Sequence, residues 1–313
     1  MNDTSPKPYN ETLIPLPGGR TLAYDSNGDP KSLTILIFFH GVFGVGNASN
    51  SNQVFSTKVF SSSHRHYRGG GVRHHVQLGR PTLKLCCPDQ SSLSRRIRSF
   101  ETIPAQIING QLFKKFPLGR QIKGLMLLSP FSKPRLDPNF NSSLSLGNWL
   151  MAGSLSHYIP FLPRLISSAF KPKFAIPSTA EQMSIQTLFD RMGEKEKDEF
   201  QEYRKKRGLE EGQLEKEFAM NAWRSVQHTM QGFIDVNNVM YEDWGFHPND
   251  IDAERLGRRV LIYAAKGDEI APNAQAYRLS ENYRNAELGM LNGGHIVGLT
   301  KIDEIWSNFL KDA

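Results

Sequence analysis

The 313-residue sequence predicts an α/β protein built on a mostly parallel sheet. Short apolar runs, with the character of strands buried on both faces, recur along the chain. Residues with a helical pattern separate these runs, and glycine-containing loops follow three of them directly. Strands that alternate with helices are typical of a parallel sheet with helices on its faces.

The first predicted elements are strands. We expect residues 1–10 to be disordered and residues 11–16 and 20–24 to form two strands joined by a proline-glycine turn. Residues 34–39 (TILIFF) form a continuous run rich in β-branched and aromatic residues, which predicts a buried strand. The loop 40–44 (HGVFG) follows at the strand's carboxyl end, where open α/β sheets build their sites.

Residues 54–98 break this pattern. They show no sustained helical or strand period, and only residues 82–87 (TLKLCC) have the composition of a strand. A stretch of this length without secondary structure is unusual inside a compact domain. We therefore expect this segment to be poorly ordered.

Regular patterns return at residue 102. Residues 102–110 suit a short helix, and residues 124–129 (GLMLLS) predict another buried strand. Residues 131–250 are helical in pattern, which indicates an insertion that covers one edge of the sheet. Within them, residues 191–224 carry charges of both signs at helical spacing, and we interpret them as a solvated face over a thin apolar stripe.

The C-terminal part resumes the alternation. Residues 259–265 (RVLIYAA) and 287–291 predict two further strands. The last helix places five apolar residues at i, i+3, i+4, i+7 and i+8, a stripe that faces the core. The stripe consists of Ile302, Ile305, Trp306, Phe309 and Leu310. Residues 11–130 and 251–313 are therefore expected to form two halves of one core.

The net charge of +7 belongs to one segment. Residues 54–98 hold nine of the 38 basic and one of the 31 acidic residues, and the rest of the chain has 29 basic and 30 acidic ones. We therefore do not expect nucleic acid as a partner. The chain shows neither a signal-peptide pattern nor an apolar run of about 20 residues, and its cysteines, Cys86 and Cys87, are adjacent. These features predict a cytoplasmic protein without a membrane partner.

Three loops that directly follow predicted strands carry the chemistry. They are the loop 40–44, Gly267-Asp268, and Gly293-Gly294-His295, which lies 27 residues after Asp268. In this order and with this spacing they resemble the α/β-hydrolase family. The resemblance covers residues 11–53 and 99–313.

The resemblance implies the fold of that family, with residues 131–250 as a helical cap. It also implies that Asp268 orients His295, which acts as the general base of a catalytic triad. The backbone N–H of Val42 would form part of the oxyanion hole. No metal or organic cofactor is implied.

The nucleophile departs from the family pattern, because G-x-S-x-G does not occur in the sequence. The best positional match is Ser99, with the N–H of Phe100 completing the oxyanion hole. However, Ile97 and Glu101 stand where the tight turn of the nucleophile needs glycines. Two explanations stay open. In the first, a mistaken gene model, such as a retained intron or a shifted reading frame, has replaced the family's strands and helices with residues 54–98. In the second, the chain is genuine and has diverged into a pseudo-enzyme.

The histidines and cysteines of residues 54–98 fit no standard zinc spacing, so we expect no metal site there. The sequence thus predicts a hydrolase that acts on an ester-like or related small molecule through Ser99, His295 and Asp268, with activity impaired or lost if the elbow is disrupted. The alternative is a catalytically inactive binding protein of the same fold. The sequence neither names the substrate nor fixes the oligomeric state.

Overall fold

The computed structural model describes five N-terminal strands by their backbone, and most of the chain from residue 102 onward with side chains. The five strands are β1 (Thr12–Leu16), β2 (Arg20–Tyr24), β3 (Thr34–Phe39), β4 (Ser62–Tyr67) and β5 (Thr82–Cys87). The remaining described residues are 102–159, 161–226 and 230–311, with the side chains of residues 232, 233 and 236 left out. The predicted disorder of residues 1–10 lies outside the described residues.

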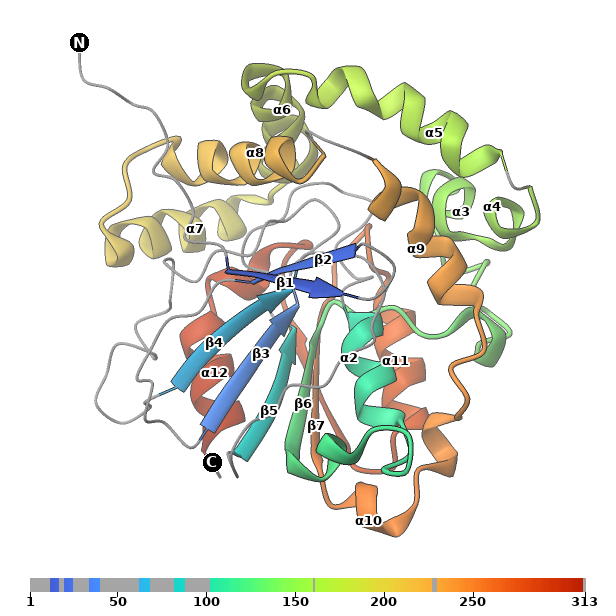
Figure 1. The fold of residues 1–313 in the computed structure, drawn as a ribbon. Coiled ribbons are helices and arrows are strands. Elements are labelled where there is room, and N and C mark those ends of the chain that lie inside the picture. The colour runs from blue at the N-terminus through green and yellow to red at the C-terminus, as the bar shows by residue number, and fades with distance from the viewer. Residues whose placement is uncertain are drawn as a thin grey trace.

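A six-stranded parallel sheet forms the centre of the fold, in the order β4-β3-β5-β6-β7-β8 (Figure 1). β6 (Ile122–Leu128), β7 (Arg259–Ala265) and β8 (Ala286–Leu291) complete it. β1 and β2 form a separate antiparallel pair. This architecture confirms the predicted fold class, a mostly parallel α/β sheet.

Two strands lie within residues 54–98, where the sequence pattern indicates only one. β5 lies between β3 and β6 at the centre of the sheet, and its register shifts between Leu83 and Lys84. β4 pairs only with β3, at the edge of the sheet. An edge strand need not bury both faces, so a polar sequence such as SSHRHY is compatible with this position. For this reason hydrophobic periodicity does not reveal β4.

The sheet is covered by helices on both faces. Along β6, Leu125 and Leu127 pack in one cluster with α2 (Thr102–Gly110) and α11 (Asn273–Asn282). The alternate residues Met126 and Leu128 pack in another cluster with α12 (Ile302–Leu310). All five residues of the predicted C-terminal stripe are at most 3% exposed. The period-two alternation thus explains why these strands are apolar on both faces.

A set of helices from Pro134 to Tyr241, here called the helical layer, lies across the carboxyl ends of the strands (Figure 1). Its elements are η3 (Pro134–Leu136), α3 (Leu146–Ala152), α4 (Ser154–Tyr158), α5 (Leu162–Phe170), η4 (Lys171–Phe174), α6 (Pro177–Ser184), the π-helical turn η5 (Ile185–Phe189), α7 (Glu194–Arg207), α8 (Gln213–Val226) and α9 (Gln231–Tyr241). The short elements η2 (Pro117–Gln121), η6 (Pro248–Asp250), α10 (Ala253–Leu256) and η7 (Val297–Leu299) lie in connections outside this layer.

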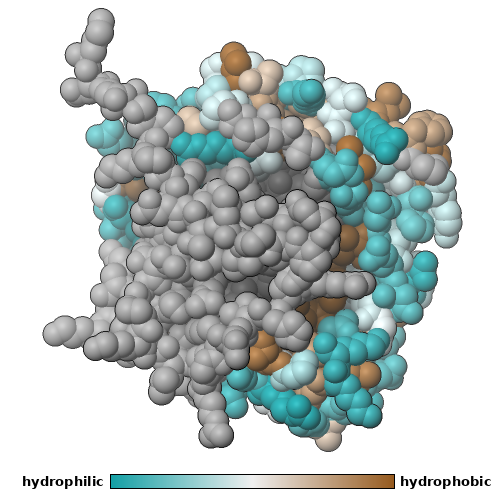
Figure 2. All heavy atoms as spheres, viewed as in Figure 1, coloured by the Kyte–Doolittle hydropathy of each residue, from teal (hydrophilic) through white to brown (hydrophobic). Residues whose placement is uncertain are grey.

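The surface of the helical layer includes exposed apolar residues at α4 and α5. In Figure 2, hydrophobic residues appear at the upper right, where Figure 1 places these helices. Tyr158, Phe161 and Leu165 are 76%, 67% and 62% exposed. None of the described helices is both long enough and apolar enough to pass through a bilayer.

Candidate active site

Asp268 and His295 meet at the carboxyl ends of two neighbouring strands. Asp268 follows β7 by three residues, and His295 follows β8 by four. Because β7 and β8 are adjacent and parallel, their carboxyl ends lie at the same edge of the sheet. The Nδ1 atom of His295 lies 2.6 Å from Oδ2 of Asp268. The structure thus brings together two of the predicted site residues.

Both carboxylate oxygens of Asp268 have hydrogen-bond partners. Its Oδ1 atom accepts hydrogen bonds from the backbone N–H groups of Ile270 at 2.8 Å and Ala271 at 2.9 Å. The side chains of Asp268 and His295 are almost fully shielded from solvent. A proton on Nδ1 satisfies the contact with Oδ2 and makes Nε2 the basic nitrogen of the imidazole. This arrangement can orient a general base and stabilise its protonated form.

Glycines allow the two site loops to approach each other closely. The backbone N–H of Gly267 donates to the carbonyl of Gly293 at 2.9 Å, and a Cβ on Gly267 would lie only 3.0 Å from that oxygen. Gly293 has φ of 142°, a conformation that side chains with a Cβ rarely adopt. Gly267 and Gly293 therefore have a structural role in joining the two loops.

Asn148 and Glu196 of the helical layer hydrogen-bond to these loops, and neither is among the residues predicted from sequence. Asn148 of α3 is buried, and its amide donates to the carbonyls of Ile270 at 2.8 Å and Glu269 at 3.1 Å. Glu196 of α7 is also buried, and its Oε2 atom accepts a hydrogen bond from the N–H of Gly294 at 3.0 Å. Burial raises the pKa of Glu196, and the nearby carboxylates of Glu199 and Asp268 raise it further.

The contacts of Glu196 correct one interpretation of the charged residues 191–224. Part of α7 is a contact surface and not a solvated face. Glu199 accepts from the hydroxyl of Thr300 at 3.2 Å, and Arg207 donates to Asp303 at 2.7 Å. Charge at helical spacing is typical of exposed helices, so the sequence gives no signal that separates these contacts from solvated residues.

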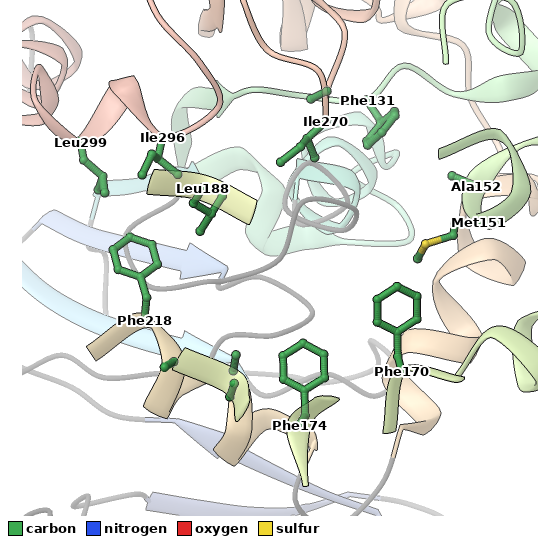
Figure 3. Packing of buried hydrophobic residues seen from close by; sticks show 14 of the residues in the cluster. Phe131, Met151, Ala152, Phe170, Phe174, Leu188, Phe218, Ile270, Ile296 and Leu299 are labelled. Carbon is green, nitrogen blue, oxygen red and sulfur yellow. The ribbon is translucent and has the colours of Figure 1, made fainter. Parts of the chain in front are cut away.

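Hydrophobic residues that flank the site belong to the core beneath the helical layer. Ile270 and Ile296 share one buried cluster with Leu188 and Phe218 of that layer. Figure 3 shows Ile296 beside Leu299, close to Leu188 and Phe218. The loops of Asp268 and His295 are thus packed under the helices as well as hydrogen-bonded to them.

A cavity adjoins His295. Ser129, the first residue after β6, lines it together with residues of β7 and β8, and Ser129 has φ of 46°. A positive φ is uncommon for serine, and such conformations cluster at functional sites. Ser129 is not among the site residues predicted from sequence, because its backbone conformation leaves no mark in the sequence.

Three predicted site residues lie outside the described residues. They are the nucleophile candidate Ser99 and the oxyanion-hole candidates Val42 and Phe100. β5 ends at Cys87 and α2 begins at Thr102. The intervening sequence contains four serines, Ser91, Ser92, Ser94 and Ser99. The nucleophile elbow requires the order strand, nucleophile, helix, and Ser99 lies between β5 and α2 in the sequence, twelve residues after the end of β5. The assignment of Ser99 stays a prediction.

No group of three histidine, cysteine or carboxylate side chains that could hold a metal occurs among the residues described with side chains. The histidines and cysteines of residues 54–98 are not among them.

Comparison with solved structures identifies the fold. A hydrolase from Pseudomonas aeruginosa aligns with a TM-score of 0.54 and 13% identity, over 96% of this chain and 97% of that chain. An α/β-hydrolase enzyme from a Medee basin deep-sea metagenome library aligns with a TM-score of 0.51 and 12% identity, over 96% and 98% of the two chains. No protein-family model matches the sequence, and neither does any curated protein. The chain therefore has the α/β-hydrolase fold.

Proposed function

We propose that this protein is a hydrolase that cleaves an ester-like small molecule through a serine nucleophile, with His295 as the general base and Asp268 as its orienting carboxylate. The 2.6 Å contact between Nδ1 of His295 and Oδ2 of Asp268, at the ends of two adjacent parallel strands, carries the proposal. The α/β-hydrolase fold supports it, since the same loops carry the acid and the base in that fold.

The proposed reaction has two stages. The serine hydroxyl attacks the carbonyl carbon of the ester and passes its proton to Nε2 of His295, and the protonated imidazole then gives this proton to the departing alcohol. In the second stage His295 takes a proton from water, the resulting hydroxide attacks the acyl-enzyme, and the serine leaves with the proton. Asp268 holds Nδ1 throughout and stabilises the imidazolium.

We assign the nucleophile to Ser99 and the oxyanion hole to the N–H groups of Val42 and Phe100, on the resemblance of their positions in the sequence. The helical layer serves as the cap that shapes the substrate pocket. The mechanism needs no metal or organic cofactor. We place the protein in the cytoplasm, with a small molecule as its partner.

Pre-steady-state hydrolysis of p-nitrophenyl esters tests this function. An initial burst of p-nitrophenol, equal to the enzyme concentration, is expected because the activated p-nitrophenyl ester acylates the serine faster than water hydrolyses the acyl-enzyme. His295→Ala should abolish the burst, and Ser99→Ala should do the same. Turnover that survives His295→Ala contradicts the assignment of the base.

The missing G-x-S-x-G pattern favours one alternative, a catalytically inactive binding protein. That protein would release no p-nitrophenol above the uncatalysed rate while binding esters reversibly, and His295→Ala would change the affinity but not a rate. The same experiment therefore separates the two functions.

A further inference from the structure

Glu196 is the point at which the helical layer contacts the histidine loop. It is the third residue of α7, is 8% exposed, and accepts the N–H of Gly294, the residue that precedes His295. A Cβ on Gly294 would lie 3.4 Å from each carboxylate oxygen of Glu196, so the carboxylate rests against the loop backbone.

The carboxyl group of Glu196 is costly to bury. Its Oε1 atom is shielded from solvent and has no hydrogen-bond partner among the described residues. A buried polar atom without a partner destabilises the folded state, so stability alone does not explain a glutamate at this position. The pKa of this group is raised by burial, although the hydrogen bond from Gly294 acts in the opposite direction.

The rest of α7 fixes the position from which Glu196 acts. Further along the helix, Glu199 contacts Thr300 and Arg207 contacts Asp303, so the helix is attached to the chain that follows the histidine loop at several points. On the other loop of the site, Asn148 binds the carbonyls beyond Asp268. Each of the two loops is thus hydrogen-bonded to a buried side chain of the helical layer.

We propose that Glu196 is a positioning residue for His295: by binding the N–H of Gly294 it holds the loop 293–295 so that Nδ1 of His295 stays on Asp268. The effect of Glu196 on catalysis rests on the proposed function. The effect of Glu196 on the loop and on the His295–Asp268 contact is independent of that function.

Three variants separate this role from a general structural one. Glu196→Ala removes the acceptor, whereas Glu196→Gln keeps an oxygen that can accept from Gly294. Glu202→Gln is the matched control, because Glu202 is exposed on the same helix. We expect Glu196→Ala to lower kcat by about 10²-fold with little change in KM, as for a misplacement of catalytic groups by about 1 Å. Glu196→Gln should retain most of the activity.

Two measurements report on the loop without turnover. Hydrogen exchange of the peptide that contains Gly294 should be faster in Glu196→Ala and restored in Glu196→Gln. In the proton NMR spectrum, the downfield resonance of the proton between Nδ1 and the carboxylate should be present in the wild type, the control and Glu196→Gln. It should be weakened or lost in Glu196→Ala. If Glu196→Ala does not fold, Glu196→Met keeps the side-chain volume without the acceptor and carries the same expectations.

The outcomes distinguish the two proposals. A wild type without turnover that nevertheless shows these exchange and NMR changes would overturn the proposed function and support the role of Glu196. A wild type with turnover, and a Glu196→Ala variant that matches it in rate, exchange and NMR signal, would overturn the role of Glu196 and leave the function intact. Equal losses of activity in Glu196→Ala and Glu196→Gln would also contradict the role of Glu196.

Discussion

Replacing Asp268 tests both the stability and the chemistry of the site. In Asp268→Ala, the buried N–H groups of Ile270 and Ala271 lose their common acceptor, which lies 2.8 and 2.9 Å away. A buried donor without a partner costs about 1–3 kcal/mol. The two together predict a loss of about 2–6 kcal/mol in the free energy of unfolding. Guanidinium unfolding at pH 7 measures this loss.

Asp268→Asn separates the two roles of the carboxylate. An asparagine oxygen can still accept from Ile270 and Ala271, so we expect a much smaller loss of stability than in Asp268→Ala. Its NH2 group then faces Nδ1 of His295, which places the imidazole proton on Nε2 and removes the base. In Ser-His-Asp enzymes this change lowers kcat by about 10⁴-fold. The two roles assigned to Asp268 are wrong if Asp268→Ala unfolds like the wild type, or if Asp268→Asn hydrolyses p-nitrophenyl esters within tenfold (about 1.4 kcal/mol) of the wild-type rate.

Three further predictions concern the core, the loop and the pH dependence. Phe309 is 1% exposed, so Phe309→Ala leaves a cavity in the core and should lower the free energy of unfolding, measured with denaturant, by about 3–5 kcal/mol. Leu165 is 62% exposed, so Leu165→Ala should change the same free energy by less than about 0.5 kcal/mol. Gly293→Ala forces a Cβ into a φ of 142° and to 2.7 Å from Val297, so we expect a loss of about 1–3 kcal/mol, and an unchanged melting temperature would contradict the strained turn. Because burial raises the pKa of Glu196, the folded chain holds this proton more tightly than the unfolded chain. The contribution of Glu196 to the free energy of unfolding therefore falls as the pH rises from the ordinary glutamate pKa through the raised pKa of the folded chain. When unfolding is measured from pH 4 to 8, this fall should be absent in Glu196→Gln.

Hydrophobic periodicity predicts the central part of the fold because burial on both faces restricts the sequence. Residues such as Leu125 and Met126 of β6 face opposite helices, so both must be apolar. β4 is under no such restriction at the edge of the sheet, and its polar sequence gives no strand signal. The sequence therefore predicts β3, β6, β7 and β8, shows only a strand-like composition at β5 within a segment expected to be poorly ordered, and gives no indication of β4.

The residues of the candidate site also fall into those that the sequence predicts and those that it does not. Asp268 and His295 are predictable because each follows a buried strand by a few residues, and neighbouring parallel strands end at one edge. Asn148 and Glu196 are not, because they reach the site from the helical layer across 122 and 98 residues of sequence. Contacts over such distances depend on how the layers pack, which a local pattern does not encode.

Labelling with a fluorophosphonate, followed by peptide mapping, reports whether the Asp268–His295 pair activates a serine. Such a probe reacts with a serine only when a base activates its hydroxyl. We expect one adduct per chain, on the peptide that contains Ser99, and no adduct in His295→Ala or Asp268→Asn. An adduct on the peptide of Ser129 would keep the base and move the nucleophile to the cavity beside His295. No adduct on the wild type, or the same labelling rate in His295→Ala, would contradict the claim that the Asp268–His295 pair serves a serine nucleophile.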